Sequence, residues 1–138
     1  MQVRLVSWQE ASAELLALRT QVFVQEQGVP IELEQDGRDA SATHALAQDA
    51  AGRALGTGRL LPSGQIGRMA VVAELRKQGI GSALLRALLE AARAAGMSEV
   101  HLHAQLSARD FYLSFGFTVA SDIYLEAGIE HLDMRAKL

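Results

Sequence analysis

One short turn in the middle of the chain restricts the fold more than any other segment. Before it, residues 66–72 are mostly apolar and are predicted to form a buried strand. After it, residues 81–95 are rich in alanine and leucine, with polar residues every three or four positions, which indicates a helix. The turn itself contains Gly79 and Gly81. A strand that runs through a glycine turn into a long helix favours a fold in which helices pack against a sheet.

The turn also has the features of a phosphate-binding loop. A helix N-terminus presents unpaired backbone N–H groups and the positive end of the helix dipole. Glycine lets an anion approach the main chain closely, and two basic side chains add full positive charge. We therefore expect this loop to bind the phosphate groups of a cofactor. Its residues are Arg76, Lys77, Gln78, Gly79, Ile80, Gly81 and Ser82.

Two common nucleotide-binding motifs do not match this loop. A dinucleotide-binding turn has a third glycine or alanine where this chain has Leu84, and an acidic residue after the next strand, where residues 103–105 have none. A nucleotide P-loop has a lysine after its last glycine, but a serine follows Gly81. The pattern that remains is R-x-x-G-x-G, formed by Arg76, Gly79 and Gly81.

The order of predicted elements gives this pattern its context. Ser7 and Glu10 resemble a capping box that opens a helix after a first short strand. A loop is predicted over residues 25–41, where glycine and proline break the pattern. The predicted strands are 3–6, 43–47, 54–61, 65–72, 100–105, 117–120 and 131–137, and the later helices are 81–95 and 108–115. Strands 65–72 and 100–105 flank a helix, so we expect them to pair in parallel.

This motif and this order of elements resemble the GNAT superfamily of acyl-coenzyme A N-acyltransferases. Further spaced residues are similar to its small ElaA-like and YjcF-like branch. Those before the motif are Arg19, Val22, Phe23, Val24, Glu26, Gln27, Gly28, Val29, Pro30, Glu34, Asp36, Asp39 and His44. Those after it are Ala104, Gln105, Phe111, Tyr112, Phe115, Gly116, Phe117, Glu126, Gly128, Ile129, His131 and Met134.

The resemblance implies one α/β (α+β) domain over residues 1–138. Its central sheet would be mixed and mostly antiparallel, with about seven strands and about four flanking helices. The fourth and fifth strands would form a parallel pair that splays apart. The resemblance also implies acetyl-CoA as cosubstrate and direct transfer of the acetyl group to a primary amine, on a small molecule or a protein.

The same resemblance assigns roles to individual residues. The pantetheine arm of the cofactor would pair with the main chain of Met69, Ala70 and Val71. Tyr112 would be the general acid that protonates the departing thiolate. Gln105 would orient the cofactor or the acceptor.

The identity of the general base stays open in the sequence. An amine with a pKa near 10.4 is neutral in only about one molecule in a few thousand at pH 7, so a group must accept its proton. The candidates are Glu26, His44 and His103, or a water held by one of them. A non-catalytic acyl-CoA sensor is the alternative to an enzyme, and a protein that uses the fold only for interaction is a third possibility.

Composition excludes several other classes. The chain has no cysteine, which excludes disulfides, thiolate metal sites and a cysteinyl acyl-enzyme. We expect no metal site, because His101 and His103 lack a third ligand nearby. No uncharged apolar run reaches about 18 residues and no signal-peptide pattern is present, so we expect a cytoplasmic protein that does not enter a membrane. Oligomeric state, monomer or homodimer, is not readable from the sequence.

Charge is unevenly distributed along the chain. The net charge is −3, but residues 53–93 carry seven basic and two acidic side chains, as binding of an anionic cofactor requires. A basic face with stacking aromatic residues is missing, so nucleic acid is not an expected partner. Acidic residues crowd the loop before residue 42, with only Arg38 to offset them; this loop would attract a cationic acceptor or form a solvated surface. They are Glu26, Glu32, Glu34, Asp36 and Asp39.

Overall fold

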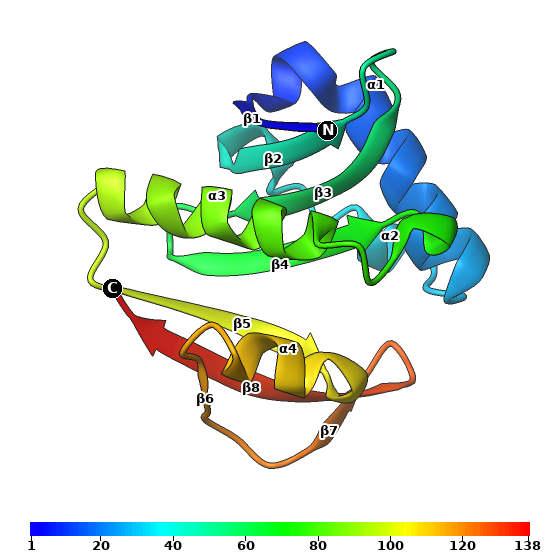
Figure 1. Cartoon of the computed structure of the whole chain (residues 1–138). Coiled ribbons are helices and arrows are strands. Elements are labelled where there is room, and N and C mark those ends of the chain that lie inside the picture. The colour runs from blue at the N-terminus through cyan, green and yellow to red at the C-terminus, as the bar shows by residue number, and fades with distance from the viewer.

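A computed structural model describes all 138 residues and has one eight-stranded sheet at its centre (Figure 1). The strand order is β1-β2-β3-β4-β5-β8-β6, and β7 pairs with β8. The strands are β1 (Gln2–Val6), β2 (Thr43–Gln48), β3 (Ala54–Leu60), β4 (Gln65–Val71), β5 (Glu99–Gln105), β6 (Thr118–Val119), β7 (Tyr124–Glu126) and β8 (Ile129–Lys137). The mixed, mostly antiparallel sheet is the one that the sequence predicts.

The pair β4 and β5 is parallel and splays apart, which confirms a second prediction. Only Gln65 and Ile66 of β4 pair with β5, opposite His101 and Leu102. Beyond these positions the two strands diverge, so that the sheet opens between them (Figure 1). The edge of β4 that faces β5 therefore has no strand partner after Ile66.

Helices cover both faces of the sheet. The α-helices are α1 (Trp8–Arg19), α2 (Ile31–Glu34), α3 (Ile80–Ala94) and α4 (Arg109–Leu113). On β2, Ala45 and Ala47 belong to the core cluster under α3, whereas Leu46 packs with Leu15 of α1. Because neighbouring strand residues point to opposite faces, α1 and α3 lie on opposite sides of the sheet.

The long helix α3 lies close against β3 (Figure 1). Its buried side chains are Ile80, Leu84, Leu85, Leu88, Leu89 and Ala92. Gly58 of β3 permits the close approach, since a Cβ atom there would lie 2.8 Å from Leu88 Cδ1 and 2.5 Å from Met69 Sδ. This packing fixes the N-terminus of α3 beside the opening between β4 and β5.

Local signals at the start of the chain are confirmed. The Ser7 side chain accepts a hydrogen bond from the Glu10 backbone, and the Glu10 carboxylate accepts one from the Ser7 backbone at 2.7 Å. The predicted capping box therefore opens α1.

Two regions differ from the sequence-based expectation. The predicted loop 25–41 contains the end of a π-helical turn (Thr20–Glu26), the short helix α2 and a 3-10 turn (Asp39–Ser41). Glycine and proline residues do separate these turns. The turns are stabilised by side-chain contacts with residues on distant strands, and a local sequence pattern cannot reveal such contacts.

The second difference is an extra strand, β7, which raises the strand count from about seven to eight. It pairs with β8 through a two-residue turn in which Ala127 and Gly128 have φ angles of +51° and +76°. Such a turn, with positive φ at both central residues, matches the twist of a tight hairpin. A three-residue strand is too short to produce a readable alternation.

Candidate active site

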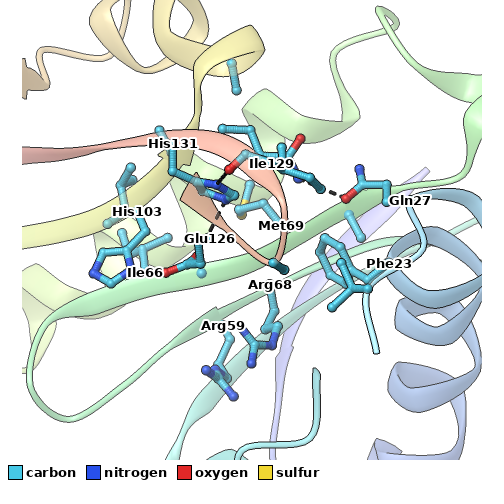
Figure 2. A pocket seen from close by; sticks show the side chains of 18 of the residues that line it. Phe23, Gln27, Arg59, Ile66, Arg68, Met69, His103, Glu126, Ile129 and His131 are labelled. Carbon is cyan, nitrogen blue, oxygen red and sulfur yellow. Dashed lines mark hydrogen bonds and ion pairs between the residues drawn. The ribbon is translucent and has the colours of Figure 1, made fainter. Parts of the chain in front are cut away.

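A cavity of about 740 Å³ lies in the opening between β4 and β5. Its walls come from these two strands, from α4, from the β7–β8 hairpin and from the segment around Phe23 and Gln27. The loop with Glu34 and Asp36 and the side chain of Arg59 on β3 complete the lining (Figure 2). Half of the lining residues are hydrophobic. The cavity thus combines apolar surface with many polar and charged groups, and its concave form suits a small-molecule site.

The predicted phosphate loop lies at one end of this cavity. The backbone N–H groups of residues 77–82 make no hydrogen bond within the chain. Gly79 is the N-cap of α3 with φ +88°, and Lys77 also has a positive φ of +64°. Gly81 and Arg76 line the cavity, whereas Lys77, Gln78, Gly79, Ile80 and Ser82 are not among its lining residues. Six consecutive unpaired donors at a helix start are suited to an anion.

The predicted pantetheine-binding segment also lines the cavity. Met69, Ala70 and Val71 all belong to its wall. The pairing of β3 with β4 shifts between Thr57 and Arg59, where one β3 residue, Gly58, lies opposite two residues of β4. This bulge sits at Arg68, whose φ is +49°. A bulge twists a strand and redirects its backbone groups, and here it does so beside the cavity.

Tyr112 reaches the cavity from α4. Its ring is buried and lies edge-on to Phe111 and Phe117, at centroid distances of 5.1 and 5.6 Å. Its hydroxyl makes no hydrogen bond within the chain although it belongs to the cavity wall. Burial raises the pKa of the Tyr112 hydroxyl above its usual range, so the group stays protonated.

Glu26, one of the predicted bases, does not line the cavity. Its carboxylate forms a bidentate ion pair with Arg76, with distances of 2.5 and 2.7 Å. The hydrogen bond from Arg76 lowers the pKa of the Glu26 carboxyl, which makes it a weaker base. The structure places Glu26 against Arg76 of the predicted phosphate loop and outside the cavity.

His44 is also remote from the cavity. Its ring is buried beside Trp8, and its Nε2–H donates to the backbone oxygen of Asp39 at 3.0 Å. Burial lowers the pKa of His44, which keeps the ring neutral. These contacts give His44 a packing role between α1, β2 and the Asp39–Ser41 turn.

The third base candidate, His103, does line the cavity, and so does Gln105. Gln105 donates from Nε2 to Gln27 Oε1 at 2.9 Å, which links β5 to the chain after the π-helical turn across the opening. Of the site residues proposed from the sequence, the structure brings His103, Gln105 and Tyr112 into one cavity with the β4 segment, whereas Glu26 and His44 lie outside it.

Two further polar side chains of the cavity were not predicted as site residues. Glu126 of β7 and His131 of β8 both line it, next to His103 (Figure 2). His103 Nδ1 lies 2.9 Å from Glu126 Oε1, and His131 Nε2 lies 3.5 Å from Glu126 Oε2. Glu126 and His131 belong to the pattern E-x-G-I-x-H, which is similar to the family branch. Because strand β7 was not predicted, the pattern did not indicate that these two side chains lie close together.

The acidic loop is held by arginines from other elements. Arg19 pairs with Glu34 and with Asp39, whose Oδ1 lies 2.8 Å away, and Arg59 pairs with Asp36 at 2.8 Å and Asp39 at 3.2 Å. These side chains are mostly buried. The expectation that only Arg38 offsets the acidic residues is therefore wrong, because charge partners 15 to 23 residues away are invisible to a local count. Glu32 alone of the five forms no ion pair.

None of the helices has the length and apolar character needed to span a bilayer. The histidine and carboxylate side chains form no group of three or more arranged to hold a metal ion.

Comparisons with known proteins agree with this geometry. Residues 8–138 match the family model described as an acetyltransferase (GNAT) domain. The chain is 35% identical over 130 residues to YjcF of Bacillus subtilis, named an uncharacterized N-acetyltransferase, covering 91% of this chain and 92% of that protein. It is 35% identical over 128 residues to ElaA of Escherichia coli, covering 87% of this chain and 83% of ElaA.

Solved structures show the same architecture. An acyl-CoA N-acyltransferase from Pseudomonas aeruginosa superposes with a TM-score of 0.88 at 32% identity, and 99% of each chain is covered. The crystal structure of Escherichia coli ElaA gives a TM-score of 0.88 at 31% identity with the same coverage. This protein is a member of the GNAT family of acyl-CoA N-acyltransferases.

Proposed function

We propose that the protein transfers an acetyl group from acetyl-CoA directly to a primary amine. The observation that carries this proposal is the row of six unpaired backbone N–H groups at residues 77–82, beside a cavity that opens between β4 and β5. A helix start of this kind stabilises phosphate oxygens, and the cavity beside it has room for the acyl end of the cofactor.

The cofactor would extend from this loop along β4. Its pyrophosphate accepts hydrogen bonds from the loop between Gln78 and Ser82, with Lys77 adding positive charge. Its pantetheine arm, which contains amide groups, pairs with the free edge of β4 at Met69, Ala70 and Val71. The missing pairing between β4 and β5 beyond Ile66 supports this placement, since an unpaired strand edge accepts an extended chain.

Tyr112 would then supply the proton for the leaving thiolate. When the amine nitrogen attacks the thioester carbon, the C–S bond breaks and the sulfur takes a proton. The Tyr112 hydroxyl has no competing partner within the chain, and burial keeps it protonated. Because the chain has no cysteine, no acyl-cysteine intermediate precedes the transfer.

A turnover screen tests the proposal. Purified protein is incubated with acetyl-CoA and pools of primary amines, and the products are examined by mass spectrometry for an added acetyl group. We expect one or more amines to be acetylated with release of coenzyme A. Tight binding of coenzyme A without acetylation of any amine would instead favour a non-catalytic acyl-CoA sensor.

A further inference from the structure

The cavity contains a group suited to remove the proton of the acceptor. A primary amine is almost entirely an ammonium ion at pH 7, and only its neutral form attacks a thioester. Glu34 and Asp36 also line the cavity, but both are paired with arginines. The side chains left to bind this cation or accept its proton are His103, His131 and Glu126, which gather on one wall (Figure 2). Their contacts within the chain determine which of the three groups is suited to accept the proton and which is suited to bind the cation.

His131 is held with one nitrogen free to accept a proton. Its Nδ1 lies 2.7 Å from the backbone oxygen of Ile129, and a carbonyl oxygen only accepts, so Nδ1 carries the hydrogen. The lone pair of the neutral ring is therefore on Nε2, which is turned toward Glu126 at 3.5 Å. This distance is too long for a well-formed hydrogen bond. The Nε2 atom therefore has a fixed direction and forms no well-formed hydrogen bond.

His103 is less suited to this role. Its Nδ1 lies 2.9 Å from Glu126 Oε1, and its Nε2 lies 3.7 Å from Asp133 Oδ1. The His103 side chain is 41% exposed, against 9% for His131, so water competes with a substrate for its ring nitrogens. Asp133 also accepts a hydrogen bond from the Tyr124 hydroxyl, so it stays an acceptor.

Glu126 is fixed beside His131 by the hairpin. It is the last residue of β7 and pairs in register with Ile129, the residue whose oxygen orients His131. The intervening turn places Ala127 at a positive φ, a conformation that a residue with a Cβ rarely adopts. The Tyr124 ring stacks on His131 at 6.2 Å between centroids. A tight, packed hairpin thus sets the carboxylate against the imidazole.

We propose that His131 is the general base of the reaction and that Glu126 binds the ammonium form of the acceptor beside it. This assignment rests on the proposed acetyl transfer and deepens it: the acceptor is a primary amine that arrives positively charged. The carboxylate of Glu126 also faces the imidazolium that forms when His131 takes a proton.

The protons balance over one turnover. The ammonium gives its first proton to His131 Nε2, which later releases it to solvent through the half-exposed side of the cluster. The neutral nitrogen attacks the carbonyl carbon, the C–N bond forms and the C–S bond breaks. Tyr112 gives a proton to the thiolate, and the second proton lost by the nitrogen restores the Tyr112 hydroxyl.

Two amines of the same size, one charged and one neutral at pH 7, show whether a substitution impairs proton removal or another step. Ethylamine is an ammonium ion at neutral pH, whereas methoxyamine has the same number of heavy atoms and is already neutral. We expect His131→Gln to lower kcat/KM for ethylamine by about 10² to 10⁴, the usual range for a general base. The loss for methoxyamine should stay below about tenfold. His131→Asn, which can still donate to the Ile129 oxygen, should behave in the same way.

Glu126→Gln should act mainly on the KM for ethylamine, raising it about tenfold or more, with little change for methoxyamine. Two matched controls change the same residue types outside the cavity: His101→Gln on β5 and the exposed, unpaired Glu130→Gln on β8. Both should retain wild-type rates with both amines. Calorimetric affinity for coenzyme A should be unchanged in all variants, which separates the acceptor site from the cofactor site.

Equal losses for ethylamine and methoxyamine in His131→Gln would overturn the assignment, as would a full rate with ethylamine. Both results leave the proposed function standing, because the wild-type protein is active in them. A wild-type protein that binds coenzyme A but acetylates no amine of the turnover screen, these two included, would contradict the proposed function itself, and the assignment with it.

Discussion

Arg76 and Glu26, 50 residues apart in the chain, form a bidentate ion pair at 2.5 and 2.7 Å. Arg76 also donates from Nε to the backbone oxygen of Val71 at 3.1 Å, so each of its three guanidinium nitrogens has a partner within the chain. The first basic residue of the phosphate loop is therefore neutralised before any anion arrives. Backbone N–H groups and Lys77 are left as the donors for phosphate.

Glu26→Gln should release Arg76 toward the phosphate. Both side chains are partly exposed, so the effect is small: the affinity for coenzyme A should rise by at most about fivefold, and less at high salt. Calorimetric titration at two salt concentrations measures this change in affinity. Arg76→Ala serves as the opposite case, because it should weaken the binding of coenzyme A. Turnover should stay near the wild-type rate. A fall in kcat of about 100-fold would instead make Glu26 the base.

Asp39→Asn should destabilise the fold without changing the affinity for coenzyme A. The Asp39 carboxylate accepts hydrogen bonds from Arg19 at 2.8 Å and Arg59 at 3.2 Å in a buried cluster. Removing one partner of a buried ion pair typically lowers the free energy of unfolding by about 3–5 kcal/mol. Urea unfolding with an unchanged m-value measures this loss. The exposed Glu32→Gln should lie within about 0.5 kcal/mol of wild type. A comparable loss in both variants would refute the role of the cluster.

The same cluster should make stability fall in acid. Burial alone would raise the pKa of Asp39, but hydrogen bonds and charge from Arg19 and Arg59 outweigh it and lower the pKa below its ordinary 3.8. The pKa of Asp36 is lowered in the same way by Arg59. A depressed pKa in the folded state adds stability above about pH 4 that is lost as the pH falls below it. The difference in unfolding free energy between wild type and Asp39→Asn should therefore shrink below pH 4; a constant difference would contradict this.

Tyr112→Phe removes one hydroxyl and keeps the packing. The hydroxyl has no partner in the chain to leave unpaired, so stability and affinity for coenzyme A should hardly change. If it protonates the thiolate, kcat should fall by about 10² to 10⁴. The fall should be smaller for an acyl donor with a more acidic thiol. Because burial raises the Tyr112 pKa, its ionisation should not produce a basic limb near pH 10 in the wild-type rate profile. Full kcat in the variant would leave water as the proton source.

The strand, glycine turn and helix at the predicted phosphate loop could be predicted because their signals are local. Gly79 and Gly81 stand between a strand and a helix within one short stretch, and Ser7 with Glu10 forms a cap within one turn. Such features depend on neighbouring residues, so a single sequence displays them. The splayed strand pair followed from the order of elements and the family resemblance.

The polar cluster at the β7–β8 hairpin could not be predicted because its contacts join residues that are far apart in the chain. Glu126 meets His103 across 23 residues, through a strand of three residues that has no readable pattern. The arginine partners of the acidic loop lie on α1, β3 and β4, so the loop looked unbalanced. His44 and Glu26 were plausible bases by residue type alone; only the tertiary structure shows what each one faces.

The most direct measurement is an NMR titration of the ¹⁵N-labelled protein with coenzyme A, which follows the backbone amides. The unpaired N–H groups of residues 77–82 should acquire acceptors on the cofactor, so their proton resonances should move downfield. Smaller shifts should appear at Met69, Ala70 and Val71 along the open edge of β4. Unmoved amides at residues 77–82, with shifts elsewhere in the chain, would contradict the placement of the cofactor.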